Sequence, residues 1–225
     1  MKNTKTIIPS TSFEFLKKLR KNNNREWFNA NKQIYQRELS GIESFTESLL
    51  DRMKKHDRID TPSGKKALMR IYRDIRFSAD KTPYKTNFSG SFHREGKLLR
   101  GGYYFQFEPG NSFIAGGFWG PSSSDLKLIR DELVFDDKPI RKVLASSKVA
   151  KVFTGLTGET LTRVPRGYDA ASPAADLLKY KQFLLQHHFT DTEILAPDYI
   201  DMAETTMKAL RPFFDYMSEV LYVPS

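Results

Sequence analysis

The chain of 225 residues contains no cysteine, which excludes disulfide bonds, thiolate catalysis and cysteine-ligated zinc. Its four histidines are poorly spaced for metal binding. His187 and His188 are adjacent and so fall on different helix faces, while His56 and His93 stand alone. The H-E-x-x-H motif of zinc enzymes is absent. We therefore expect neither a metal site nor a cofactor.

Long apolar runs are absent as well. No stretch approaches the roughly 20 apolar residues that a membrane span requires. The first ten residues hold only two adjacent apolar side chains, Ile7 and Ile8, far short of the apolar core of a signal peptide. These absences predict a cytoplasmic protein without a membrane partner.

The sequence also lacks the glycine motifs of nucleotide-binding loops, G-x-x-x-x-G-K-[ST] and G-x-G-x-x-G, and the G-x-S-x-G elbow of serine hydrolases. Glycine is nonetheless concentrated in one region of the chain. We expect these glycines to allow bulges or close backbone approach in a strongly bent sheet. They are Gly101, Gly102, Gly116, Gly117 and Gly120.

The composition is that of an ordinary globular protein, with 39% apolar and 28% charged residues. The length predicts a single domain over residues 1–225, in which residues 1–10 form a loose lead-in. The formal net charge of +9 predicts attraction to polyanions or phosphorylated metabolites. The alternative is a solvated cationic surface that has no specific ligand.

Helical spacing of apolar residues dominates both ends of the chain. Thr11 and Glu14 have the spacing of a capping box, which predicts a helix over Ser12–Lys21. The clearest helical pattern spans Arg25–Lys55. Four later segments are also expected to be helical. These are 122–133, 137–153, 172–188 and 197–222, the last with a kink at Pro212.

Strand patterns lie between these helical parts. The turn signal P-G-N at residues 109–111 separates Gly101–Glu108 from Ser112–Trp119, which predicts a β-hairpin. Thr86–Arg94 is expected to add a strand, and Leu161–Val164 a short one. The predicted fold class is α+β, in which a central antiparallel sheet of about 4–5 strands is flanked by N-terminal and C-terminal helices.

The segment Arg70–Lys85 combines charged, aromatic and turn-forming residues at a higher density than any other part of the chain. Its first half fits both the two-residue period of a strand and the apolar spacing of a helix. We predict a strand over Arg70–Phe77, because Ser78–Pro83 is rich in turn formers and because Ile, Tyr and Phe favour strands.

Cations dominate this part of the chain. Seven of them lie between positions 65 and 85, against two anions, Asp74 and Asp80, so the segment supplies +5 of the net charge of +9. The cations are Lys65, Lys66, Arg70, Arg73, Arg76, Lys81 and Lys85.

The series R-x-x-R-D-x-R-F followed by D-K-x-x-Y resembles the signature of domain of unknown function family 2461. Asn22–Phe28 is similar to that family's opening N-N-x-R-E-W-F stretch, and Pro165–Asp169 to its later P-R-G-(aromatic)-D stretch. The resemblance covers nearly the whole chain, but the family is uncharacterised, so it implies no activity. The residues that match the signature are Arg70, Arg73, Asp74, Arg76, Phe77, Asp80, Lys81 and Tyr84.

The clustered arginines lead to the hypothesis of an anion site. Guanidinium groups donate paired hydrogen bonds to phosphate or carboxylate, and lysine adds a mobile charge. We expect an anionic small molecule as ligand, with Asp74 and Asp80 orienting the guanidiniums. The alternative is a structural network of arginine and aspartate that ties strand to loop. The expected ligand-binding residues are Arg70, Arg73, Arg76, Lys81, Tyr84 and Arg166.

Two other functions follow from the same residues. In the first, a nucleic acid binds to basic side chains and stacks on tyrosines such as Tyr72 and Tyr84 or Tyr103 and Tyr104. In the second, an enzyme acts on a phosphorylated substrate. Asp74 or Asp80 then serves as the catalytic base, and the arginines stabilise the developing anion.

Overall fold

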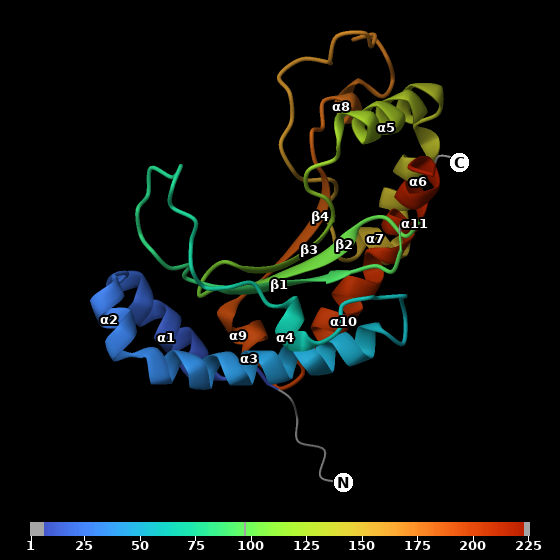
Figure 1. The fold of residues 1–225 in the computed structure, drawn as a ribbon. Helices are drawn as coiled ribbons and strands as arrows, with labels where there is room; N and C mark the ends of the chain where they lie inside the picture. The colour runs from blue at the N-terminus through green and yellow to red at the C-terminus, as the bar shows by residue number, and fades with distance from the viewer. Residues whose placement is uncertain (1–6, 97, 223–225) are drawn as a thin grey trace. The chain divides into compact units, whose positions relative to one another are not determined.

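The computed structural model of the protein describes residues 7–96 and 98–222 (Figure 1). Part of the expected loose lead-in, residues 1–6, lies outside the described residues, whereas Ile8 is buried. The helices of the first half are α1 (Ser10–Lys21), α2 (Arg25–Ala30), α3 (Lys32–Met53) and α4 (Gly64–Ala67). The later helices are α5 (Ser123–Phe135), α6 (Lys138–Ala145), α7 (Ser147–Ala150), α8 (Ala175–Leu178), α9 (Asp191–Ile194), α10 (Tyr199–Ala209) and α11 (Arg211–Val220).

Four strands form one antiparallel sheet in the order β1-β2-β3-β4. The fold is therefore α+β, and this expectation is confirmed. The expected strands at 86–94, 101–108 and 112–119 are present within one or two residues of their predicted ends. The strands are β1 (Phe88–His93), β2 (Gly102–Phe107), β3 (Ser112–Phe118) and β4 (Phe183–Phe189).

The chain divides into two compact units, each with its own buried apolar side chains. Unit 1 comprises residues 1–92, 104–114 and 188–205, and unit 2 comprises residues 93–103, 115–187 and 206–225. The single domain over residues 1–225 stays a prediction. Among residues 7–96 and 98–222, every helix is too short or too polar to cross a membrane.

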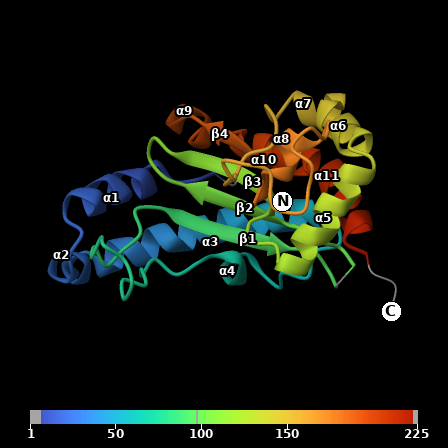
Figure 2. The ribbon, with the colours of Figure 1, turned by 90° about the horizontal axis from the view of Figure 1, so that it is seen from above.

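Unit 1 is built on the long helix α3, along which α1 runs (Figure 2). Phe45 in the middle of α3 packs edge-on against Phe107 of β2, with ring centroids 5.6 Å apart. It also stacks on Tyr199 at the start of α10, again at 5.6 Å. All three rings are buried, so aromatic packing forms the centre of this unit.

The expected capping box of α1 is wrong, because Thr11 is engaged elsewhere. Pro9 precedes the helix, and its side chain cannot cap it. The Thr11 hydroxyl donates instead to the buried Glu38 carboxylate of α3 at 2.7 Å, and the Ser12 hydroxyl donates to the same oxygen at 3.1 Å. A buried carboxylate needs donors, and these two hydroxyls fix α1 to α3.

The expected helix over Arg25–Lys55 is divided at Asn31 into α2 and α3. The Asn31 side-chain amide donates to the Trp27 carbonyl at 2.9 Å, which satisfies the end of α2. The preceding N-cap of α2 is Asn24, whose side chain accepts from the Trp27 amide. Asparagine competes with the helical backbone for hydrogen bonds, so it ends and begins helices.

In unit 2, α11 is held by a buried guanidinium. The Arg94 side chain is 0% exposed, donates to the Asp215 carboxylate of α11 at 2.7 Å, and lies over the Phe214 ring with 5.5 Å to its centroid. Tyr103 meets the same ring edge-on at 5.0 Å. A fully buried arginine requires such partners, and here they belong to the C-terminal helix.

The helix predicted over 172–188 is wrong, because its second half is strand β4. Only Ala175–Leu178 is helical. Phe183, Leu184 and Leu185 are buried in succession, each at most 4% exposed. A strand that is covered on both faces appears in the sequence as a continuous apolar run, which periodicity cannot distinguish from a buried helix.

Two glycines confirm the expected close approach in the sheet. Gly117 has φ +141°, and a Cβ atom there would lie 2.1 Å from the Phe183 carbonyl oxygen. A Cβ atom on Gly116 would lie 2.4 Å from the Leu210 side chain. Any larger residue at these positions would collide with the neighbouring strand or helix.

Each of the last two helical regions is divided. The region 137–153 is interrupted at Ser146, whose backbone is extended, and gives α6 and α7. The C-terminal region gives α10 and α11, which meet at Leu210. Pro212 lies in the first turn of α11, where its missing N–H has no helical partner to lose, so it starts a helix rather than kinking one.

The short strand expected at Leu161–Val164 does not form. Two isolated bridges occur just before it, between Thr157 and Leu184 and between Thr160 and Tyr180.

Candidate functional site

The segment expected to be a strand at Arg70–Phe77 is an irregular loop, and the prediction of a regular strand is wrong. The two arms of this loop meet in one antiparallel bridge between Tyr72 and Tyr84. Two backbone hydrogen bonds flank it, one at 2.9 Å from Arg73 to Pro83 and one at 2.8 Å from Lys85 to Ile71. We call residues 70–85 the basic loop (Figure 1).

The tip of the basic loop, residues 74–82, is held by side chains instead of a strand ladder. The Arg76 amide donates to the Asp74 carboxylate at 3.3 Å, and the Thr82 amide donates to the Asp80 carboxylate at 2.9 Å. Aspartates that bind amides two residues onward form turns, which explains why strand propensity fails here. Pro83 adds a position without an amide donor.

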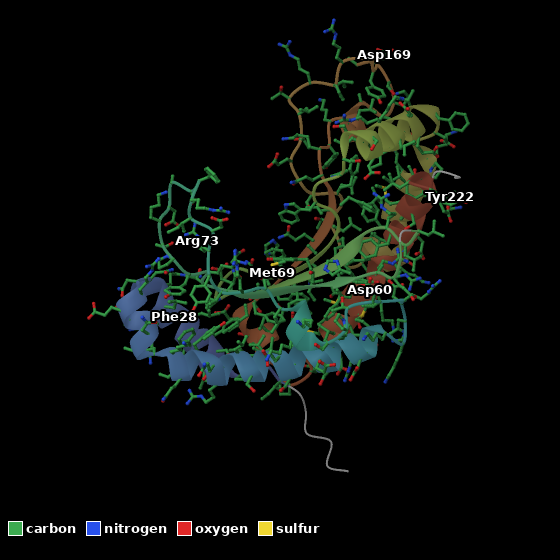
Figure 3. All side chains as sticks on the ribbon, viewed as in Figure 1. Phe28, Asp60, Met69, Arg73, Asp169 and Tyr222 are labelled. Carbon is green, nitrogen blue, oxygen red and sulfur yellow. The ribbon has the colours of Figure 1, made fainter. Side chains whose placement is uncertain are left out.

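The base of the loop is fixed by Asn23, which precedes α2. The Tyr84 backbone amide donates to the Asn23 side-chain oxygen at 3.1 Å, and the Asn23 side-chain amide donates to the Tyr84 carbonyl at 2.9 Å. The Tyr84 ring stacks on Phe28 of α2 with centroids 3.9 Å apart (Figure 3 labels Phe28 and, on the loop, Arg73). Tyr84 is only 4% exposed, so it forms a wall of the site.

Arg73 spans the loop from the inside. Its guanidinium donates to the Asp80 carboxylate and to the Thr82 hydroxyl, and a longer bond of 3.4 Å reaches the Ser78 hydroxyl. The Thr82 hydroxyl in turn donates to Asp80 at 3.0 Å. Arg73 therefore closes the tip, and part of the site is a structural ion-pair network.

Both aspartates are poor candidates for a general base. The pKa of Asp80 is lowered to about 2, first by the Thr82 backbone amide and then by the hydrogen bond from Arg73. The pKa of Asp74 is also lowered, chiefly by the Arg76 side chain. A carboxylate with a depressed pKa takes up a proton only weakly near neutral pH. Catalysis by either residue stays a prediction without geometric support.

An open pocket of about 420 Å³ lies beside the basic loop in unit 1. Three cations line it against one carboxylate. Arg73 and Lys85 belong to the loop, Arg20 comes from α1, and Asp80 is the carboxylate. The other lining residues are Asn23, Thr82, Tyr84, Thr86 and Asn87.

Lys85 differs from the two arginines, because no carboxylate of the described residues pairs with it. Its amine has only a contact of 4.0 Å with the Met69 sulfur. Partial burial, and then the charge of Arg70, lower the pKa of Lys85. An ammonium group without a counter-ion is electrostatically unsatisfied and favours an arriving anion.

Two of the remaining polar side chains of the pocket form hydrogen bonds to Glu108, whereas the side-chain oxygen of a third lacks a hydrogen-bond partner among the described residues. Arg20 donates to the Glu108 carboxylate at 3.0 Å, and the Thr86 hydroxyl donates to the same oxygen at 2.7 Å. The side-chain oxygen of Asn87, by contrast, is buried and accepts no hydrogen bond in the part of the chain that the structure describes. Asn87 is thus a polar group beside the pocket that lacks a partner.

The expected site residues are only partly brought together. Arg73, Asp80 and Tyr84 line the pocket, whereas Arg166 belongs to unit 2. The remaining four belong to the basic loop but do not line the pocket. These are Arg70, Asp74, Arg76 and Lys81, the last of which donates to the Ile75 carbonyl at 3.0 Å.

Six pocket residues were not among the expected site residues, namely Arg20, Asn23, Thr82, Lys85, Thr86 and Asn87. Lys85 was visible only as part of the charge count, and Asn23 only as part of the Asn22–Phe28 stretch that carries the family resemblance. Arg20 and Asn87 carry no sequence signal, because they reach the pocket through tertiary packing. Among the described residues, no group of three or more His, Asp or Glu side chains is placed to hold a metal ion.

The family model described as conserved hypothetical protein (DUF2461) matches residues 11–216. This match covers most of the chain, so the protein belongs to that family, as the resemblance implied. No curated protein and no solved structure matches the chain. Two of the stretches that carry the resemblance meet at the pocket, where Asn23 binds the backbone of Tyr84.

Proposed function

We propose that this member of the conserved hypothetical protein family DUF2461 binds a small molecule that bears a phosphate or carboxylate group in the pocket of unit 1. The observation that carries the proposal is the ammonium of Lys85, which lines the same pocket as the guanidiniums of Arg20 and Arg73 and has no ion-pair partner among the described residues. An anion there would supply the counter-ion that residues 7–96 and 98–222 do not.

The two arginines support binding without leaving their present partners. Each guanidinium has five N–H donors in a planar fork. Arg73 uses its donors on Asp80, Thr82 and Ser78, and these bonds fix its plane. A guanidinium held in this way needs little further ordering when a ligand binds, which lowers the entropic cost of binding.

The size of the pocket limits the ligand. A volume of about 420 Å³ is in the lower part of the range of about 300–1,000 Å³ that is typical of small-molecule sites. One wall is aromatic, since Tyr84 stacks on Phe28. This combination favours a compact metabolite with one anionic group and a small organic body over a long polymer.

The test is a thermal-shift screen of the full chain with inorganic phosphate, sugar phosphates, nucleotides and small carboxylates. Ligands that bind the native state raise the melting temperature as saturation increases. We expect one compound class to raise it, and Lys85→Gln to remove the shift. Lys65→Gln is the matched control, because Lys65 is an exposed lysine on α4 that does not line the pocket.

Two results would contradict the proposal. In the first, no anion changes the melting temperature of the wild type. In the second, Lys85→Gln and Lys65→Gln lower the response of a stabilising ligand equally, which would indicate general charge attraction instead of a site.

A further inference from the structure

The outer side of the basic loop carries an aromatic ring that the fold leaves uncovered. Phe77 is 97% exposed. The Arg76 guanidinium lies 5.9 Å from the centroid of its ring and is itself 76% exposed. Burying a phenylalanine side chain is normally favourable, so a ring left uncovered at a loop tip is available to a partner.

A second exposed ring lies at the base of the loop, two residues after a further arginine. Tyr72 is 50% exposed, and one part of its ring packs on Phe28 and Tyr84 at 6.1 and 5.4 Å. The neighbouring Arg70 is exposed and forms no ion pair among residues 7–96 and 98–222. The tip and the base of the loop thus each hold an exposed ring and an exposed arginine that are close together in the sequence.

We propose that Arg70, Tyr72, Arg76 and Phe77, here called the loop surface, bind single-stranded nucleic acid. None of these residues lines the pocket, so this inference does not depend on the proposed ligand. Exposed rings stack on unpaired bases of any sequence, and arginines contact the phosphates between them. The positive charge of the segment and of the whole chain favours an anionic polymer.

The ion pair between Arg76 and Asp74 does not prevent this role. The two hydrogen bonds, of 3.0 and 2.7 Å, lie between side chains that are 76% and 48% exposed. Solvent-exposed pairs of this kind contribute little stability, so a phosphate can replace Asp74 at little cost. Asp74 then keeps the guanidinium oriented until the phosphate arrives.

Other partners fit the loop surface less well. A DNA duplex hides the faces of its bases, so the exposed rings would have nothing to stack on. A lipid surface would favour several apolar side chains at the tip, yet Phe77 is followed by Ser78, Ala79 and Asp80. The alternation of ring and guanidinium is the arrangement expected for an unpaired strand.

The test measures fluorescence anisotropy of labelled 20-nucleotide oligo(dT) and oligo(U) with the full chain at 50 mM and 200 mM salt. We expect binding that weakens with salt, and Phe77→Ala to weaken it about tenfold through the loss of one stacked base. Phe77 is 97% exposed, so the Phe77→Ala variant is expected to fold.

Matched controls come from unit 2. Phe135 is 86% exposed and Arg163 is exposed, so Phe135→Ala and Arg163→Ala remove one ring and one charge that do not belong to the loop surface. The proposal is overturned if neither oligonucleotide binds or if Phe135→Ala weakens binding as much as Phe77→Ala. It is also overturned if anionic phosphatidylserine vesicles, and not oligonucleotides, show binding that depends on Phe77.

Discussion

Replacement of Asn23 by alanine tests how the basic loop is held to the rest of unit 1. The Asn23 side chain accepts a hydrogen bond from the Tyr84 backbone amide at 3.1 Å and donates one to the Tyr84 carbonyl at 2.9 Å. It thus pairs with the Tyr84 backbone as a residue of a neighbouring β-strand would. Asn23→Ala removes both bonds and leaves a backbone N–H and a C=O beside a buried ring.

The expected loss follows from these two bonds. Each intramolecular hydrogen bond contributes about 1 kcal/mol net, so Asn23→Ala should lower the free energy of unfolding by about 2 kcal/mol. Asn22 offers a matched control, because its side chain makes a single exposed bond of 2.9 Å to the Lys18 carbonyl. Asn22→Ala should change the stability by less than about 0.5 kcal/mol.

Urea denaturation monitored by circular dichroism gives the free energy of unfolding of each variant. The two values can be compared if the dependence of the free energy on urea concentration is the same in both. Protection of the Tyr84 amide from hydrogen exchange should also fall in Asn23→Ala and stay unchanged in Asn22→Ala. Equal stabilities for the two variants would refute the role given to Asn23, since the sequence context of the two asparagines is nearly the same.

Three further predictions concern other parts of the chain. Binding of the proposed pocket ligand should weaken as the pH rises through the lowered pKa of Lys85, because only the ammonium form attracts an anion. Ligand titrations from pH 7 to 11 would measure this pH dependence, and Lys85→Arg should remove it. The pKa of Glu38 is lowered: burial would raise it, but hydrogen bonds from Thr11, Arg37 and Ser12 outweigh this effect. The stability that the ionised Glu38 carboxylate contributes is therefore complete above the unfolded pKa of about 4.3 and is lost as the pH falls through the lower folded pKa. Glu38→Gln should accordingly flatten the decline in the free energy of unfolding between pH 5 and 3. Gly117→Ala should lower the free energy of unfolding by at least about 3 kcal/mol, because the new Cβ would lie 2.1 Å from a carbonyl oxygen. Gly120 has open space around it, so Gly120→Ala should change the free energy of unfolding by less than about 0.5 kcal/mol in the same denaturation assay.

The sequence predicted the fold wherever a local pattern matched the local structure. The P-G-N turn and its flanking alternation located the hairpin of β2 and β3, and helical spacing located α3 and α5. It failed at β4, where burial on both faces removes the alternation that identifies a strand. It also failed at Asn31 and Ser146, where a single residue ends a helix that the apolar pattern continues.

The site was predicted less completely than the fold. Clustered charge singled out residues 70–85, but it did not show that they form a loop, or that Arg73 pairs with Asp80 while Arg76 pairs with Asp74 in solvent. That difference depends on the turn chemistry of the loop tip, which strand periodicity does not describe. Arg20 approaches the loop from α1 only through the folded chain, so no local pattern marks it.

The hydrogen bonds between Asn23 and Tyr84 also constrain the order of folding. They join residues 61 positions apart, and the bond from Arg20 to Glu108 joins residues 88 positions apart. Contacts of such long sequence separation require the entropy of closing the intervening chain to be overcome, so we expect the pocket to be assembled late in folding. On this expectation, the proposed ligand recognises a feature absent from the folding transition state. We therefore expect it to slow unfolding and to leave the refolding rate unchanged, which stopped-flow kinetics with and without ligand would measure.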